Sequence, residues 1–153
     1  MLQYLLQIIA AGAVGLILGQ SNKSNSKVPA GRVFCIICMG SALLAIISVE
    51  YSKAIGLPWI TDPGRISAQV VSALGFLGTG MVWISADNHV KGLPIAAGLW
   101  FAAILGILIG AGSFSISVVA IAFLLIINWL SKFVESVKKT AKIERHKLLE
   151  KDE

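Results

Sequence analysis

The residues with the richest chemistry lie between Asp62 and Ser72. Asp62 stands before Pro63, and this order predicts a helix start, because the carboxylate accepts free backbone N–H groups and proline suits the first helical position. Arg65, Gln69 and Ser72 follow at intervals of four and three residues, so they stack along one helical face. Together with the Asp62 carboxylate, this face could form a polar pocket or a site for a partner.

A plainer interpretation of the same face stays open. In it Asp62 is only a helix cap, Arg65 extends its guanidinium toward water, and Gln69 hydrogen-bonds to a neighbouring helix. Amides and hydroxyls inside a bilayer are costly unless they are partnered or face a wet cavity. Both interpretations meet that requirement, so the sequence alone does not choose between them.

Three glycines follow this face, at Gly75, Gly78 and Gly80. Glycine lets another backbone approach closely, so the segment predicts close packing. It is not a nucleotide-binding loop, because no strand is expected before it and it lies in an apolar helical segment.

The other reactive residues give no catalytic pattern. Cys35 and Cys38 have the C-x-x-C spacing of redox and metal sites, but no neighbouring charge would lower a thiol pKa. Two thiols also make only half of a structural zinc site, so packing is the favoured interpretation. His89 and His146 lie in an expected loop and in the tail. We therefore expect no catalytic residue, no metal and no cofactor, and no enzyme.

The elements that carry these residues are those of a membrane protein. Of the 153 residues, 56% are hydrophobic and only 14% are charged, whereas soluble domains have about one quarter charged residues. The net charge of +5 comes from basic residues at the ends of apolar segments and in the tail. That distribution indicates membrane anchoring rather than nucleic-acid binding.

The apolar segments predict an all-α polytopic fold with about five transmembrane helices. Each segment is close to the roughly 20 residues that a spanning helix needs. The expected spans are Leu2–Gly19, Val33–Val49, Ile66–Ile84, Leu93–Gly110 and Phe114–Leu130. The first has no basic residue before it and no cleavage signal after it, so we expect a retained span. Residues 1–130 then form the membrane domain, in contact with the lipid bilayer.

Lysine and arginine set the expected orientation. The first connection carries Lys23, Lys27 and Arg32, and the third carries Lys91. The tail, residues 131–153, is basic and partly amphipathic at its start. The positive-inside rule places these parts in the cytoplasm and the N-terminus outside. Trp83, like Trp59 and Trp129, is expected near a membrane interface.

A row of small residues marks the fourth expected helix, at Gly98, Ala102, Gly106 and Gly110. Small residues at intervals of four let membrane helices approach closely. Such a row fits packing within the chain or the seam of a homo-oligomer, and both stay open.

At this point the residues resemble a known family. The run from Asp62 to Gly80, followed by Val90-Lys91-Gly92-Leu93 and Ala96-Ala97-Gly98-Leu99-Trp100, resembles the membrane domain of the MgtC/SapB family. The positions that match the family pattern are Asp62, Arg65, Gln69, Ser72, Gly75, Phe76, Leu77, Gly78 and Gly80.

The sequence also departs from that pattern. The acidic run that usually follows the first span is replaced by Gly19-Gln20-Ser21-Asn22, and a histidine of the family is absent from the segment Ala30–Cys35. Many members carry a soluble C-terminal domain, where this sequence has a basic tail. We therefore expect the membrane domain only.

The resemblance implies a multi-pass protein of the bacterial inner membrane, tied to magnesium limitation, stress adaptation and virulence. It also implies action on other membrane machines such as ATP synthase, rather than magnesium transport. The leading hypothesis is a non-enzymatic regulator that associates through its helices with a partner membrane protein or with itself, a dimer being favoured. The alternative is a small transporter or channel subunit whose polar pathway is lined by the third helix.

Overall fold

The computed structural model describes residues 1–21, 29–56, 62–86, 88–127 and 129–130. Within them the chain is helical apart from one short hairpin, so the predicted all-α fold is confirmed. The helices are α1 (Leu2–Ser21), α2 (Ala30–Ile55), α3 (Gly64–Met81), α4 (Leu93–Gly110) and a fifth helix, Phe114–Ile127. The predicted tail, residues 131–153, and Trp59 lie outside the described residues.

Helix α2 is longer than the sequence predicted. It continues past Val49 to Ile55 and ends at Gly56, whose φ of 68° is the left-handed conformation that glycine adopts at helix ends. Glu50 and Lys53 therefore lie on the helix and not in the connection. Their side chains form an ion pair of 2.8 Å across one turn, a spacing that supports the last helical turns.

Helix α3 is shorter than predicted, and the expectation that it reaches Ile84 was wrong. It ends at Met81, because Val82 is extended. Trp83–Ile84 then form strand β1, which pairs antiparallel with strand β2, Val90–Lys91. Aromatic and β-branched side chains favour strands over helix, which explains the change of structure at this point.

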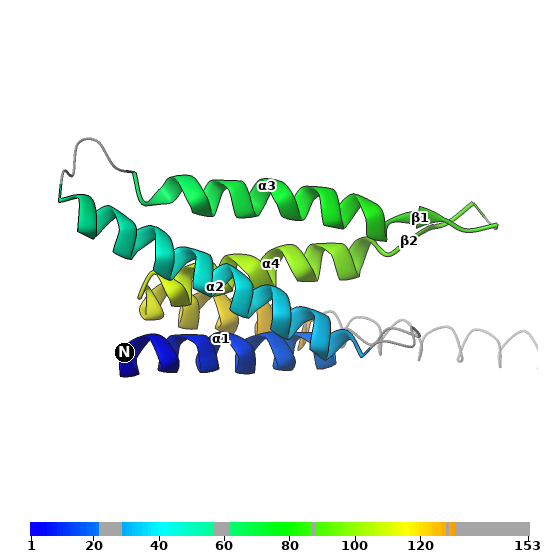
Figure 1. The fold of residues 1–153 in the computed structure, drawn as a ribbon. Helices are drawn as coiled ribbons and strands as arrows, with labels where there is room; N and C mark the ends of the chain where they lie inside the picture. Colours follow the sequence, from blue (N-terminus) through cyan, green and yellow to red (C-terminus); the bar gives the residue numbers. More distant parts are fainter. Residues whose placement is uncertain (22–28, 57–61, 87, 128, 131–153) are drawn as a thin grey trace, which may run out of the picture. The chain divides into compact units, whose positions relative to one another are not determined.

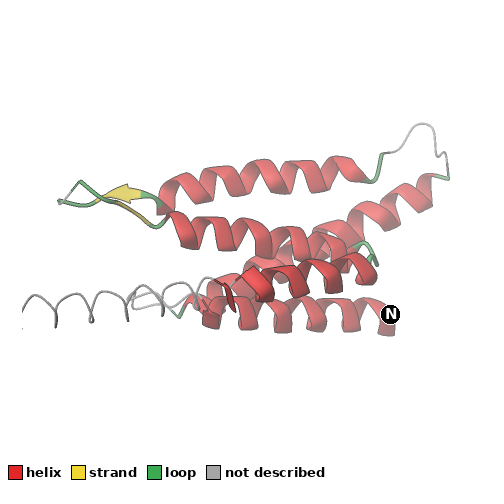
Figure 2. Cartoon of the chain, turned by 180° about the vertical axis from the view of Figure 1, so that it is seen from behind, coloured by secondary structure: helices red, strands yellow, loops and turns green. Residues whose placement is uncertain are grey.

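The chain divides into two units, residues 1–117 and residues 118–153. In the first unit α2 packs against both α1 and α4, and α3 packs mainly on α4 on the side away from α1 (Figures 1 and 2). In the second unit the described residues continue the fifth helix.

The four helices of the first unit alternate in direction (Figure 1). We call the end with Leu2, Ile55, Gly64 and Gly110 the pocket end, and the opposite end, which carries β1 and β2, the hairpin end. Among described residues the hairpin end carries Arg32 and Lys91. The side chains at the pocket end cancel in charge, and they are Glu50, Asp62, Lys53 and Arg65. This asymmetry agrees with the predicted topology; which end faces the cytoplasm stays a prediction.

Three of the described helices are long and apolar enough to cross a membrane, and these are α1, α2 and α4. Helix α3 has 18 residues like α4 but is less apolar, because its polar side chains replace aliphatic ones. The fifth helix is shorter in its described part.

The core of the first unit is made of small side chains. Ala11, Cys38, Ala42 and Ile109 form a buried cluster where α1, α2 and α4 meet. Cys38 packs in this cluster and both cysteines are free thiols, in line with a packing role. A Cβ atom placed on Gly15 of α1 would lie 2.7 Å from the Cα atom of Cys35, so the helices cross at backbone distance.

Candidate functional site

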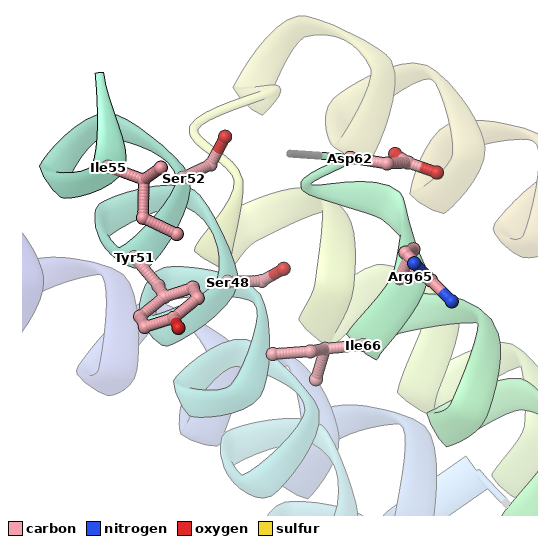
Figure 3. Close-up of a pocket in the computed structure, with 7 residues that line it drawn as sticks. All are labelled: Ser48, Tyr51, Ser52, Ile55, Asp62, Arg65 and Ile66. Atoms are coloured by element: carbon pink, nitrogen blue, oxygen red, sulfur yellow. The ribbon is translucent and has the colours of Figure 1, made fainter. Parts of the chain in front are cut away.

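A pocket of about 340 Å³ opens between the last turns of α2 and the first turns of α3 (Figure 3). Its lining is mainly apolar, with polar groups from both helices. The residues around it are Ser48, Tyr51, Ser52, Ile55, Asp62, Arg65 and Ile66. The structure therefore places two of the predicted site residues, Asp62 and Arg65, at a cavity.

The start of α3 is fixed by two hydrogen bonds. The backbone N–H of Gly64 donates to Oδ1 of Asp62 over 2.8 Å, so the carboxylate satisfies one free N–H of the first turn, as predicted. The assigned helix begins one residue later than expected, with Pro63 as the flanking residue. From α2, the Ser48 hydroxyl donates to the carbonyl oxygen of Pro63 over 2.6 Å, which holds the two helices together at the pocket.

The charged groups lie at the edge of the pocket. Asp62 and Arg65 are both exposed, and their charged ends point away from α2, whereas Ile66 points toward it (Figure 3). The cavity thus offers hydroxyl groups on its α2 side and one charge of each sign at its rim. Such groups can bind a polar ligand or a partner by hydrogen bonds.

The described residues contain no group of three His, Cys, Asp or Glu side chains placed to hold a metal ion. Ser48, Tyr51 and Ser52 were missed in the sequence analysis. A signal for them was available, because they are polar residues at the end of an apolar helix and lie close before Asp62 in the sequence.

The structure separates Gln69 and Ser72 from the pocket. Both are exposed on the side of α3 that faces away from α2 and α4, and neither side chain has a hydrogen-bond partner among the described residues. We call this side the outer face of α3. Its exposed residues are Arg65, Ala68, Gln69, Ser72, Gly75, Phe76, Thr79 and Gly80.

The glycines of α3 and α4 are used differently. A Cβ atom on Gly106 or Gly110 of α4 would overlap the carbonyl oxygen of Cys38 or Ala42, so these glycines serve the crossing with α2. Ala102, of the same predicted row, is buried and Gly98 is partly buried. This row is therefore used, at Gly106 and Gly110, for packing within the first unit.

On α3 only one glycine of the predicted close-packing segment, Gly78, faces another described helix. Among described atoms, a Cβ atom on Gly78 would meet only the Cβ atom of Ala96, at 3.8 Å, and one on Gly75 or Gly80 would meet none within 4 Å. Next to them, the Phe76 side chain is 81% exposed. The outer face of α3 thus combines open glycines, unpartnered polar groups and a projecting aromatic ring.

Comparison with known proteins relates this chain to one family. The sequence profile of the MgtC family matches residues 8–137. Protein MgtC of Salmonella typhimurium is 33% identical over 130 residues, which are 85% of this chain and 53% of that protein. The Escherichia coli protein named "Putative magnesium transporter YhiD" is 34% identical over 119 residues, which are 76% of this chain and 53% of that protein. The chain spans about half the length of these relatives, and no solved structure matches it significantly.

Proposed function

This chain belongs to the MgtC family, and we propose that it is a non-enzymatic regulator in the bacterial inner membrane, with a role in magnesium homeostasis. The magnesium part of the proposal is supported by the name of the Escherichia coli relative. The mechanism that we propose is helix–helix association through the outer face of α3.

One observation carries this mechanism: the outer face holds polar groups that no described residue satisfies. In hydrocarbon an unpartnered amide or hydroxyl is costly, so Gln69 and Ser72 are poorly placed against lipid. Glycine in a helix also costs about 1 kcal/mol relative to alanine. That cost is offset at Gly106 by the crossing with α2, but no described residue packs against Gly75 to offset it there.

A second copy of the chain is the occupant that we favour. In a two-fold interface the same patch meets itself, so it must contain both projections and depressions. The outer face has both, because the ring of Phe76 projects next to the small residues Ser72 and Gly75. Close approach through such small residues is a main source of association between membrane helices.

The test compares one substitution at two exposed alanines. Ala68→Leu adds bulk to the outer face of α3, and Ala13→Leu adds the same bulk to an exposed position of α1. With two differently tagged copies in mild detergent, we expect Ala68→Leu to abolish co-purification and Ala13→Leu to keep it. In cells lacking the native gene, only Ala13→Leu should restore growth at low magnesium.

Equal membrane levels and thermal unfolding of the two variants would show that both are folded. Co-purification that survives Ala68→Leu would overturn the proposed interface. If the wild-type chain captures another membrane protein, such as ATP synthase, in place of its own copy, the self-association is wrong. Growth at low magnesium that does not depend on the chain would overturn the magnesium role.

A second candidate is a small transporter or channel subunit with a polar pathway along α3. The pocket with Arg65 at its rim favours it, because a cavity with hydroxyl groups and a charged rim at one end of a membrane bundle can admit solute. Proteoliposomes test this candidate: it requires solute flux with the wild-type chain and lower flux with Arg65→Ala. Equal leakage from both preparations and from empty liposomes would eliminate it.

A further inference from the structure

The β1–β2 hairpin is the part of the first unit that extends beyond the helices (Figure 1). Its strands pair Trp83 with Lys91 and Ile84 with Val90. Beyond the strands, the N–H of Ser85 donates to the carbonyl oxygen of His89 over 2.9 Å, which continues the ladder. The backbone groups of this short segment are thus largely paired with one another.

The two faces of the hairpin differ in chemistry. Residues directly opposite in an antiparallel pair share a face, so Ile84 and Val90 make one face and Trp83 and Lys91 make the other. The first face is wholly apolar, with Ile84 72% and Val90 59% exposed. The second combines a ring that prefers membrane interfaces with a cation.

The base of the hairpin is held against the ends of two helices. Gly92 has a φ of 89°, and a Cβ atom there would overlap the carbonyl oxygen of Met81, the last residue of α3. The N–H of Val82 also donates to the carbonyl oxygen of Thr79 over 3.3 Å. The hairpin therefore begins directly at the end of α3 and leads directly into α4.

Helix length fixes the depth of the hairpin. With 18 residues each, α3 and α4 are about 27 Å long at about 1.5 Å per residue, slightly less than the roughly 30 Å of hydrocarbon in a bilayer. Two strand residues add only about 7 Å. Both strands therefore lie at the boundary between acyl chains and headgroups. An isolated two-stranded hairpin with exposed apolar residues is only marginally stable in water. At this depth its apolar face can contact lipid instead of water.

We propose that the hairpin is a lipid-binding surface. The face of Ile84 and Val90 contacts the acyl chains next to the headgroups of the leaflet at the hairpin end. On the other face, one residue closer to the helix ends, Trp83 lies at the same boundary, and the Lys91 side chain extends outward so that its ammonium reaches phosphate, a headgroup contact typical of lysine near helix ends. Arg32, in the first turn of α2, gives the same end of the unit a second positive charge.

Depth-dependent quenching of Trp83 tests the proposal. The other three tryptophans, Trp59, Trp100 and Trp129, are replaced by phenylalanine, and the full chain is reconstituted in phospholipid vesicles. We expect lipids brominated near the headgroup to quench Trp83 strongly, and lipids brominated near the bilayer centre to quench it weakly. Quenching by aqueous iodide alone would place the hairpin in water, and quenching by neither would mean that protein covers it; either result overturns the proposal.

A matched pair of variants tests the apolar face. Ile84→Asp should draw the hairpin toward water and lower the quenching by brominated lipid at least twofold. Ala86→Asp places the same charge beyond the strands, at an exposed position, and should leave the quenching unchanged. If Ile84→Asp also leaves it unchanged, the contact of Ile84 with acyl chains is wrong.

Discussion

The amide nitrogen of Gln7 donates a hydrogen bond to the carbonyl oxygen of Gly110 over 3.3 Å, across 103 residues of sequence. Gln7 lies near the start of α1 and is only 3% exposed, and Gly110 is the last residue of α4. Turn residues satisfy the neighbouring carbonyls of α4, those of Ile107, Leu108 and Ile109. Gln7 therefore completes the C-terminal end of α4 from another helix.

Replacement of Gln7 by methionine should lower stability modestly. Methionine keeps the length and most of the volume of the side chain but removes the donor. Because the Gly110 carbonyl would then be buried without a partner, we expect a loss of about 0.5–1.5 kcal/mol in the free energy of unfolding. Reversible unfolding in detergent micelles measures it. The Oε1 atom of Gln7 is buried and has no partner among the described residues, which limits the loss. A loss of several kcal/mol would contradict this account.

Gly106→Ala should destabilise the fold, because its new Cβ atom overlaps the Cys38 carbonyl oxygen and pushes α4 away from α2. Overpacking of this kind costs about 1–3 kcal/mol. Gly40→Ala, on α2, is the matched control: its Cβ meets no described atom within 4 Å, and it should raise helix stability by up to about 1 kcal/mol. Thermal unfolding of both variants checks the difference, and a similar response from the two would show that the α2–α4 crossing is not tight.

Ser48→Ala should weaken the contact between α2 and α3 at the pocket. It removes the donor to the Pro63 carbonyl and should lower the free energy of unfolding by about 1 kcal/mol. Ser115→Ala removes the same hydroxyl from an exposed position of the fifth helix, where it has no described partner, so the free energy of unfolding should stay unchanged. Hydrogen exchange at the first turn of α3 should quicken in Ser48→Ala alone. Faster exchange in both variants would argue against the specific contact.

Gly92→Ala should disrupt the base of the hairpin. A left-handed backbone costs a non-glycine residue about 1–2 kcal/mol, and the overlap with the Met81 carbonyl adds to that cost. Gly80→Ala, one residue before the end of α3, places a Cβ atom that meets no described neighbour within 4 Å, so the hairpin should keep its structure. Proteolysis at the hairpin, followed in vesicles, should become faster only in Gly92→Ala. An unchanged rate would mean that the close approach of Gly92 and Met81 is not required.

Local signals in the sequence predicted most of the helices. The apolar runs gave the fold class and the bounds of α4, because a helix in lipid needs length and hydrophobicity, which are properties of one segment. Asp62 and Pro63 predicted the start of α3 to within a residue, since capping is also local. The end of α3 was misplaced, because Val82, Trp83 and Ile84 are apolar enough for a span. The partner strand that makes Trp83 and Ile84 a strand follows later in the chain.

The sequence by itself determined that this is a helical membrane protein whose third helix has Arg65, Gln69 and Ser72 on one face. Only the tertiary structure decided which neighbours the small residues of α4 and the polar residues of α3 have. A row of glycines is equally suited to a contact within a chain or between chains, and the position of α2 decided that Gly106 and Gly110 pack inside. The same packing left the polar residues of α3 on its outer face, with Arg65 also at the rim of the pocket and Gln69 beyond it. Periodicity shows which residues share a face, whereas the neighbours of that face depend on segments far away in the sequence.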